Sequence, residues 1–325
     1  MGSAVVGRAA VGKVIVVGSF NVDHVWRCPE LPAPGATLAG EYASGPGGKG
    51  FNQAMAAVRA GADTCFVCAL GNDAGAALAR SLAQDDGIDL RAQPSEAPTG
   101  TAGIFVDAHG RNSIVIGAGA NAALSPGFVT AQADTFATAS VVLAQLESPL
   151  AAIDAALNAA RAAGAIAMLN PAPANATVPR GLLALCDLIT PNETEFAALV
   201  AAHCDERVDP AAIAGGDDAI LHALARRLLP GGSVLVTLGA SGLFVSHPAD
   251  AMRGDHQAHY RIAAEAATVV DTTGAGDACN GAFAASLALR PGRAFREHAA
   301  FANHYAARAT EQAGAALAMP HLRPQ

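Results

Sequence analysis

Continuous apolar runs and amphipathic stretches alternate along most of the chain. Residues 14–17 form a continuous apolar run that ends at Gly18, which is typical of a central strand in a parallel sheet. The same reading predicts further strands at 64–70, 140–146, 165–169, 185–190 and 233–238, and helices at 52–60, 74–84, 150–163, 193–202 and 217–229. This alternation predicts an α/β fold, in which a doubly wound, mainly parallel sheet is flanked by helices on both faces.

Two stretches interrupt this alternation. Residues 21–45 are rich in Pro and Gly, and residues 95–120 contain two alternating strands, 101–107 and 112–116, around a turn. Both stretches leave and rejoin the predicted sheet next to candidate site loops. We therefore expect them to pair as a small β-sheet that covers the site as a lid, although surface hairpins without a function would give the same pattern.

Composition limits the class of protein. Of the 325 residues, 52% are hydrophobic and 15% charged, so we expect a large core in a single domain at 13–325, preceded by a flexible leader at 1–12. A net charge of −8 and the lack of a basic run argue against a nucleic-acid partner. No apolar stretch approaches the roughly 18 residues of a membrane helix, and the leader is too short and glycine-broken for a signal peptide. We expect a cytoplasmic protein.

Cys65 and Cys68 form a CxxC pair, which raises the possibility of a redox or zinc site. They lie in a predicted strand, where residues three apart point to opposite faces of the sheet. No second cysteine pair supplies the remaining ligands of a zinc site. We therefore expect the six cysteines to be reduced core thiols.

The most informative motif is DTTGAGD at 271–277. Residues 268–270 are β-branched and predict a strand, whereas residues 278–288 are mostly apolar and predict a buried helix. The glycine turn between them therefore lies at a helix N-terminus, where free N–H groups and the helix dipole favour an anion. Asp277, in the first helical turn, is then either a simple helix cap or a base beside an anion site.

Two polar clusters lie near the N-terminus. Asp23 comes soon after the first strand, where its carboxylate either accepts hydrogen bonds from a vicinal diol or ends a turn. The loop GPGGKGFNQ at 45–53 matches G-x-G-x-x-G, but it does not directly follow the first strand as a dinucleotide-binding loop does, and it lacks the Ser or Thr of a Walker A loop. It remains a glycine loop that permits close backbone approach to a ligand, with Lys49 and Asn52 as donors.

Two further clusters lie in the second half of the chain. Asn192 and Glu195 have the spacing of a capping box at the start of a helix, which explains both residues without any ligand. Alternatively, Glu195 acts through water on the Mg²⁺ of a nucleotide. The turn TLGASG at 237–242 either holds a nucleotide or is only a turn.

Together these motifs resemble the ribokinase branch of the PfkB carbohydrate kinase superfamily. The matching segments occur in the same order within residues 13–320: GSFNVD (18–23), GPGGKGFNQA (45–54), QLE (145–147), NPAPA (170–174), TPNETE (190–195), TLGASG (237–242) and DTTGAGDACNGAF (271–283). The resemblance implies a large α/β domain with a β-sheet lid, a homodimer formed through the lid, and ATP-dependent phosphorylation of D-ribose at O5.

The resemblance also implies a role for individual residues. Asp277 is the base, and the anion hole is formed by Gly274, Ala275 and Gly276. The positions that match the sugar site are Asn21, Asp23, Gly48, Lys49, Asn52, Glu147 and Asp277. The positions that match the nucleotide site are Asn192, Thr237, Gly239, Ser241, Gly242, Gly276 and Asn303. Two cations are implied: Mg²⁺, organised through water by Glu195, and activating K⁺ at Asp271, Thr273, Ala309, Gln312, Gly314 and Ala318.

Two positions depart from the ribokinase pattern. Phe51 stands where ribokinases usually have a small Ala, and its ring either narrows the sugar pocket or packs behind it. Asn303 stands where many ribokinases carry a His against the adenine. A kinase for another sugar or a nucleoside therefore stays open as an alternative, and a sugar-binding regulator without catalysis is a less favoured one because Asp277 is retained.

Overall fold

The computed structural model describes residues 12–324. The leader predicted at 1–12 therefore lies, apart from Gly12, outside the described residues. Among the helices of residues 12–324, none is long and apolar enough to span a membrane.

The main sheet has nine strands in the order β13-β12-β11-β10-β9-β8-β1-β4-β5. Seven of them run parallel, and β12 and β13 complete one edge in antiparallel fashion. Their bounds are β1 (Lys13–Val17), β4 (Asp63–Leu70), β5 (Asp89–Pro94), β8 (Val141–Ala144), β9 (Ile166–Leu169), β10 (Leu188–Ile189), β11 (Ser233–Thr237), β12 (Leu243–Ser246) and β13 (His259–Ile262). The predicted doubly wound, mainly parallel sheet is confirmed.

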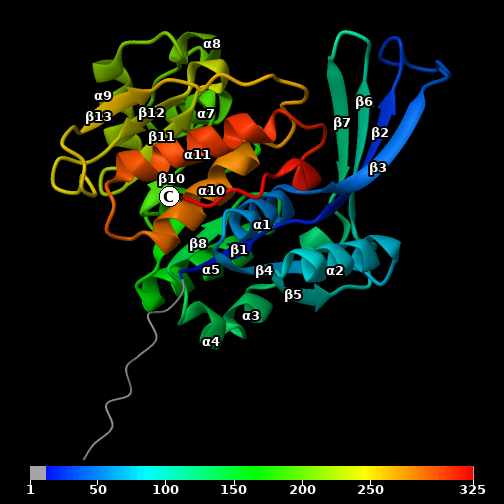
Figure 1. The fold of residues 1–325 in the computed structure, drawn as a ribbon, viewed down its shortest axis with the longest axis horizontal. Coiled ribbons are helices and arrows are strands. Elements are labelled where there is room, and N and C mark those ends of the chain that lie inside the picture. The colour runs from blue at the N-terminus through cyan, green and yellow to red at the C-terminus, as the bar shows by residue number, and fades with distance from the viewer. Residues whose placement is uncertain (1–11, 325) are drawn as a thin grey trace, which may run out of the picture.

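Helices cover both faces of this sheet (Figure 1). One face packs against α1 (Lys49–Arg59), α2 (Ala74–Asp86), α10 (Ala275–Leu289) and α11 (Phe295–Ala309). The other packs against α3 (Pro126–Thr130), α4 (Ala133–Phe136), α5 (Leu150–Ala163), α6 (Arg180–Leu183), α7 (Glu193–His203), α8 (Pro210–Ile213) and α9 (Asp218–Leu228). Successive residues of β1 enter opposite cores, Val14 one and Ile15 the other, which is why its apolar run is unbroken.

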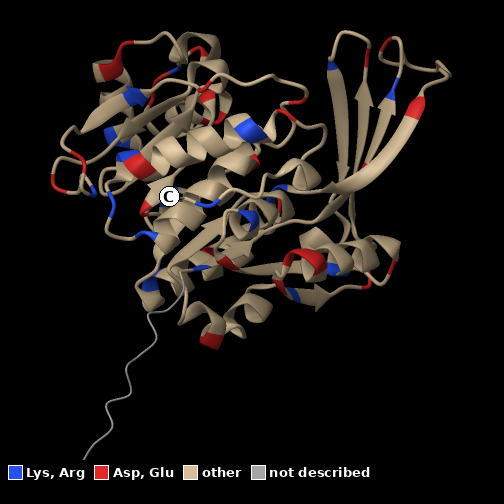
Figure 2. Ribbon diagram, viewed as in Figure 1, with Lys and Arg blue, Asp and Glu red and all other residues tan. Residues whose placement is uncertain are grey.

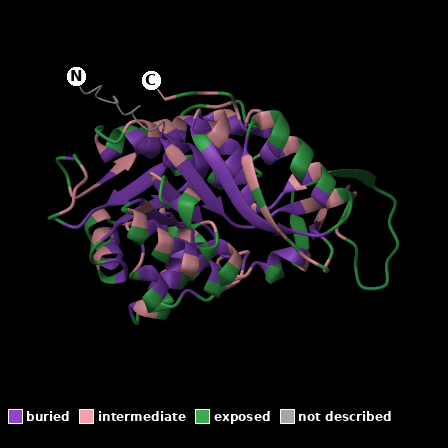
Figure 3. Ribbon diagram, turned by 90° about the horizontal axis from the view of Figure 1, so that it is seen from below, coloured by how far each residue is buried: buried purple, intermediate pink, exposed green. Residues whose placement is uncertain are grey.

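A second sheet, which we call the small sheet, has the strand order β3-β2-β6-β7. Its strands are β2 (Asn21–Arg27), β3 (Glu41–Gly47), β6 (Gly100–Val106) and β7 (Asn112–Gly117). The interrupting stretches of the sequence thus pair with one another, as predicted. The small sheet stands beside the main body at the right of Figure 1, and Figure 2 shows few charged residues along its strands. Its strands are far less buried than those of the main sheet (Figure 3).

The CxxC pair shows how the central strand β4 divides the two cores. Cys65 and Cys68 are both buried, and they lie in opposite hydrophobic cores on the two sides of the sheet. All six cysteines are free thiols. This arrangement confirms the structural interpretation of the pair.

The prediction of a strand at 268–270 is wrong. The segment runs along the surface without a neighbouring strand, and Val269 and Val270 are 60% and 63% exposed. The Val270 N–H instead donates to the carbonyl of Thr310 at 2.8 Å. β-branched residues favour strands mainly through packing against neighbours, and here no neighbour is present.

Other elements differ in extent from the prediction. The strand expected at 185–190 is reduced to the two residues of β10, because α6 and its turn precede it. The helix expected at 52–60 begins at Lys49. Strands β5, β12 and β13 lie at or next to the sheet edges and were not predicted. The edge strands β5 and β13 are only partly buried and therefore lack a continuous apolar run, whereas β12 is fully buried but only four residues long.

Candidate active site

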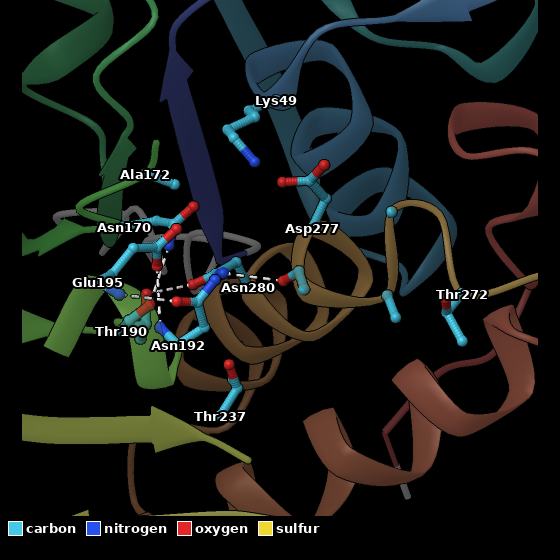
Figure 4. Close-up of a pocket in the computed structure, with 13 residues that line it drawn as sticks. Lys49, Asn170, Ala172, Thr190, Asn192, Glu195, Thr237, Thr272, Asp277 and Asn280 are labelled. Atoms are coloured by element: carbon cyan, nitrogen blue, oxygen red, sulfur yellow. Dashed lines mark hydrogen bonds between the residues drawn. The ribbon is translucent and has the colours of Figure 1, made fainter. Parts of the chain in front are cut away.

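The candidate site lies at the carboxyl ends of the parallel strands, where ligands of such sheets gather. The segments that follow β9 and β10 and the end of β11 meet the start of α1 and the start of α10 there. The pocket between them is lined by Lys49, Asn170, Ala172, Thr190, Asn192, Glu195, Thr237, Thr272, Gly274, Ala275, Gly276, Asp277 and Asn280 (Figure 4). The structure thus brings together the predicted base, the predicted anion hole, Lys49, Asn192, Glu195 and Thr237.

The predicted anion hole is the first turn of α10. Gly274 caps the helix in the left-handed region with φ 76°, a conformation that favours glycine. The N–H of Ala275 donates to the carbonyl of Thr272 at 3.1 Å. Since the first N–H groups of a helix have no partner inside it, those of Gly276 and Asp277 are the donors left for a bound anion.

Asp277 is 6% exposed and is held by two amides of α1. Its Oδ2 accepts from Asn52 Nδ2 at 2.9 Å, and its Oδ1 accepts from Gln53 Nε2 at 2.8 Å. The Lys49 ammonium and the Asp277 carboxylate point toward one another across the pocket (Figure 4). The charge of Asp277 raises the pKa of Lys49 against the opposing effect of burial, so the ammonium stays protonated.

The predicted sugar-site residues gather on the small-sheet side of Asp277. Glu147 Oε2 accepts from Ser19 Oγ at 2.5 Å and from the Lys49 N–H at 3.0 Å. Burial, and then the charges of Glu147 and Asp277, raise the pKa of Asp23 to about 7. Asp23, near the start of β2, therefore lies close enough to both carboxylates for their charges to raise its pKa.

Two glycines make this close packing possible. A Cβ on Gly47 would lie 2.1 Å from Asp23 Oδ2, so the carboxylate rests directly on the backbone of β3. Gly48 has φ 87°, and a Cβ there would lie 2.9 Å from the Ser19 carbonyl. These contacts explain the glycine loop by close backbone approach.

Two residues near the proposed sugar site contact other parts of the protein with their side chains. Asn21 is buried, and its Oδ1 accepts from Asn121 Nδ2 at 2.8 Å, which ties the start of β2 to the segment after β7. Phe51 is fully buried in a hydrophobic core and is not part of the pocket lining, and its ring lies 5.0 Å from that of Phe20 and 5.8 Å from that of Phe66. Of the two possibilities for Phe51, the structure selects packing behind the loop.

The nucleotide side begins at the capping box of α7. The Glu195 N–H donates to Asn192 Oδ1 at 2.8 Å, and the Asn192 N–H donates to Glu195 Oε2 at 2.9 Å. Glu195 also lines the pocket. The same side chain can therefore cap the helix and act through water on a Mg²⁺ ion. Burial raises the pKa of Glu195, against the hydrogen bond from Asn192 and the charge of Lys49.

The remaining predicted nucleotide residues lie outside the pocket lining. Gly239, Ser241 and Gly242 form the turn after β11, and Gly242 has φ 88° with a Cβ position only 2.0 Å from the Ile262 carbonyl. Asn303 of α11 donates from Nδ2 to the Ala263 carbonyl at 2.8 Å. The turn after β11 thus packs against the end of β13, and α11 is hydrogen-bonded to the residue that follows β13.

The predicted potassium loop is organised by Asp271. Its Oδ1 accepts from the N–H and the hydroxyl of Thr273 at 2.9 and 2.7 Å, and its Oδ2 accepts from the Gly314 N–H at 2.9 Å. Although burial acts to raise it, these hydrogen bonds hold the pKa of Asp271 below its usual value. The structure thus joins Asp271, Thr273 and Gly314 directly. Ala309 and Gln312 belong to the same turn, and Ala318 lies in the short helix η3 (Ala316–Ala318) beyond it.

Metal binding at this site is restricted by the side chains present. Within residues 12–324, His, Cys, Asp and Glu do not gather in threes as direct ligands of a metal ion. A single buried carboxylate such as Glu195 fits an ion that keeps much of its water shell, which is how Mg²⁺ is commonly held.

Three polar residues that line the pocket, Asn170, Thr190 and Asn280, were not predicted, and neither was Gln53, which lies behind the pocket and contacts Asp277. Asn280 is 2% exposed inside the mostly apolar helix α10, and its Nδ2 donates to the Gly276 carbonyl at 2.8 Å. A polar residue in an apolar helix must find a partner, and this signal was present in the sequence.

Comparison with known proteins agrees with this geometry. The family model described as pfkB family carbohydrate kinase matches residues 11–322. The chain is 36% identical over 309 residues to the ribokinase of Haemophilus influenzae, covering 94% of each protein. It is 38% identical over 314 residues to a bifunctional ribokinase/ribose-5-phosphate isomerase A of Fructilactobacillus sanfranciscensis, and there it covers 95% of its own length but only 54% of that protein.

The fold is also similar to that of a solved ribokinase. The structure of Arabidopsis thaliana ribokinase complexed with ribose and ATP superposes with a TM-score of 0.82 at 28% identity, covering 95% of this chain and 96% of that one. Motifs, fold and family model coincide over nearly the whole length, and the chain therefore belongs to the pfkB family of carbohydrate kinases.

Proposed function

We propose that this protein transfers the γ-phosphoryl group of ATP to O5 of D-ribose, giving ribose 5-phosphate and ADP. The observation that carries the proposal is the position of Asp277: a buried carboxylate, held by two amides, that faces Lys49 at the glycine-capped start of α10. A base beside an anion-binding turn is what attack of a hydroxyl on a phosphoryl group requires.

In this mechanism Asp277 takes the proton from O5 as the oxygen attacks the γ-phosphorus. Gly274, Ala275 and Gly276 form the turn that receives the transferring group, and the N–H groups of Gly276 and Asp277 are the donors to its charge, because that of Ala275 is bonded to Thr272. Lys49, which faces Asp277 across the pocket, adds a positive charge beside the transferring group. The sugar is surrounded by Asp23, Glu147, Asn52 and Gly48, which fix its hydroxyls. Asn21, the first residue of β2, supports this part of the site through its hydrogen bond with Asn121.

The nucleotide is placed on the opposite side of Asp277. Asn192 and Thr237 line the pocket there, and Gly239, Ser241, Gly242 and Asn303 extend the same side toward α11. Mg²⁺ held through water near Glu195 supplies charge neutralisation for the phosphates. The turn of Asp271 and Thr273, with Ala309, Gln312, Gly314 and Ala318 close by, offers oxygens for K⁺ beside the anion-binding turn.

We also propose that the small sheet is a lid and the contact between two copies of the chain. Its strand β7 is exposed along its whole length, and Ile114, Val115 and Ile116 are 51%, 68% and 49% exposed. Contiguous exposed apolar residues of this kind mark an interaction surface. A second copy that covers them forms a homodimer. We also propose a cytoplasmic location, which the six free thiols support.

The alternative acceptors are another sugar or a nucleoside. Phe51 does not favour them, since its ring packs into the core and leaves the sugar side unchanged. A sugar-binding regulator without catalysis is less favoured, because binding alone gives no role to an oriented carboxylate at Asp277.

The acceptor is tested by ADP release from ATP with ribose, deoxyribose, fructose and several nucleosides, each with the wild-type protein and with Asp277→Ala. Ribose should give the highest kcat/KM. Faster turnover of a nucleoside would replace the proposed acceptor, and no turnover with any acceptor would favour the regulator.

A further inference from the structure

A chain of buried amides runs behind Asp277. Gln145, two residues before Glu147, donates from Nε2 to Gln53 Oε1 at 2.5 Å. Gln53 in turn donates from Nε2 to Asp277 Oδ1 at 2.8 Å. Both glutamine side chains are fully buried, so neither can exchange its partners for water. Neither residue has a place in the proposed mechanism.

The direction of these hydrogen bonds is set by a backbone carbonyl. The carbonyl of Thr190 can only accept, so Asn170 must donate to it from Nδ2, at 2.9 Å. Asn170 Oδ1 then faces Gln53 Nε2 at 3.1 Å. Gln53 therefore presents its N–H groups to two oxygens, that of Asn170 and that of Asp277, and a flipped amide would set oxygen against oxygen at both contacts.

The same network reaches the anion-binding turn. The hydroxyl of Thr190 is hydrogen-bonded to Asn280 Oδ1, and Asn280 Nδ2 donates to the Gly276 carbonyl at 2.8 Å (Figure 4). A continuous set of buried polar groups thus connects the base to the turn that receives the phosphoryl group. Gln53, Asn170, Thr190 and Asn280 each make at least two hydrogen bonds of this network, whereas Gln145 Oε1 has no partner within residues 12–324. The satisfied members fix the relative position of the groups that they join.

We propose that Gln53 is a positioning residue for the base: it orients the Asp277 carboxylate toward the sugar hydroxyl and stabilises its charged form. A carboxylate that accepts hydrogen bonds is favoured as the anion, which is the form that can take a proton. Asn52 donates in the same way to Asp277 Oδ2. It borders the proposed sugar site, however, whereas Gln53 is fully buried and does not contact the sugar. This inference rests on the proposed function, because it concerns the same base.

Other charged groups face Asp277 and must be separated from it in a test. They are Lys49 from α1, Asp23 from β2 and Glu195 from α7, and Glu147 after β8 acts in turn on Lys49 and Asp23. Asp23 contacts the sugar and titrates near neutral pH, so it affects kcat/KM. The pH dependence of kcat at saturating ribose and ATP isolates the step in which the bound hydroxyl loses its proton.

The test compares Gln53→Met and Gln53→Glu in the full chain. Gln53→Met removes the donor, and we expect kcat at pH 7 to fall about tenfold or more and the acid limb of the kcat profile to move up by about one pH unit. Gln53→Glu sets a second carboxylate beside Asp277, so its acid limb should move further. Gln145→Met leaves the contact to Asp277 in place, and its shift should be smaller than that of Gln53→Met.

Ser286→Ala is the matched control, since Ser286 is a fully buried polar residue of α10 that is hydrogen-bonded to His298 at 2.8 Å, away from the site. It should lower the melting temperature without moving the acid limb. If the Gln53 variants lower only the melting temperature and keep the wild-type acid limb, Gln53 supports the fold alone and the inference is wrong. If Asp277→Ala itself keeps its turnover, the assignment of Asp277 as the base has failed. That failure of the proposed function can be distinguished from a failure of the inference on Gln53, which leaves the loss of turnover in Asp277→Ala unchanged.

Discussion

Lys49 and Asp277 face each other across the pocket from the first turns of two helices, α1 and α10, that are separated by more than two hundred residues in the sequence. Each helix begins at a glycine with positive φ, Gly48 before α1 and Gly274 before α10. The pair therefore sits where two helix N-termini converge, and both dipoles favour negative charge between them.

Loss of the Lys49 charge should impair turnover more than it impairs folding. We expect Lys49→Met to lower kcat by about a hundredfold, because one positive charge beside a transferring phosphoryl group is removed. The other lysine of the chain, Lys13, is the matched control: it pairs with Asp63 at 3.7 Å at the opposite end of β1. Steady-state kinetics of Lys13→Met should match the wild type, and equal losses in both variants would contradict the role of Lys49.

Sugar affinity should depend on pH through Asp23. Because its pKa is raised to about 7, Asp23 is protonated below neutral pH and then accepts fewer hydrogen bonds from hydroxyls. The KM for ribose should rise as pH falls from 8 to 6, while kcat at saturation changes less. In Asp23→Asn the KM should be high and flat over this range. A wild-type KM that does not change with pH would count against Asp23 as a sugar ligand.

The same residue should affect stability with a definite sign. The folded-state pKa of Asp23, about 7, lies above the ordinary value of 3.8. The folded protein therefore binds more protons than the unfolded one between these two pH values, and its stability falls as pH rises toward 7. Asp23→Asn removes this penalty. Its melting temperature should exceed that of the wild type at pH 8 and approach it near pH 4.

Potassium should activate the enzyme through the turn of Asp271. Turnover in sodium buffer should be several times lower than in potassium buffer of equal ionic strength. Asp271→Asn places an amide where Oδ2 accepts from Gly314, or Oδ1 from Thr273, and so disturbs the turn. This variant should lose most of the potassium response. Equal wild-type rates in both salts would contradict a potassium site.

The small sheet should hold two copies of the chain together. Val115 and Ile116 are exposed and point to opposite faces of β7, so Val115→Lys and Ile116→Lys test the two faces separately. Ile220→Lys, at a position 62% exposed on α9, is the control. Light scattering should find a wild-type dimer that one of the β7 variants dissociates and the control does not. A monomeric wild type would contradict the proposal.

The main sheet was predictable because each buried parallel strand is an unbroken apolar run, and Cys65 and Cys68 could be assigned to opposite cores from strand geometry alone. The segment 268–270 was not, because β-branched residues predict a strand only where a neighbouring strand exists. The partner of Gln53 was not predictable either. Gln53 lies in a predicted helix, but the carboxylate that it contacts is 224 residues away in the sequence, and only the fold brings the two together.

The most direct test of the account is the turnover of Asp277→Ala, measured together with its binding of ATP. Loss of the base should lower kcat by about a hundredfold to ten-thousandfold. ATP affinity should remain within a few-fold of wild type, because the nucleotide lies on the side of Asn192 and Thr237. A variant that binds ATP normally and keeps a wild-type kcat would contradict the assignment of Asp277 as the base.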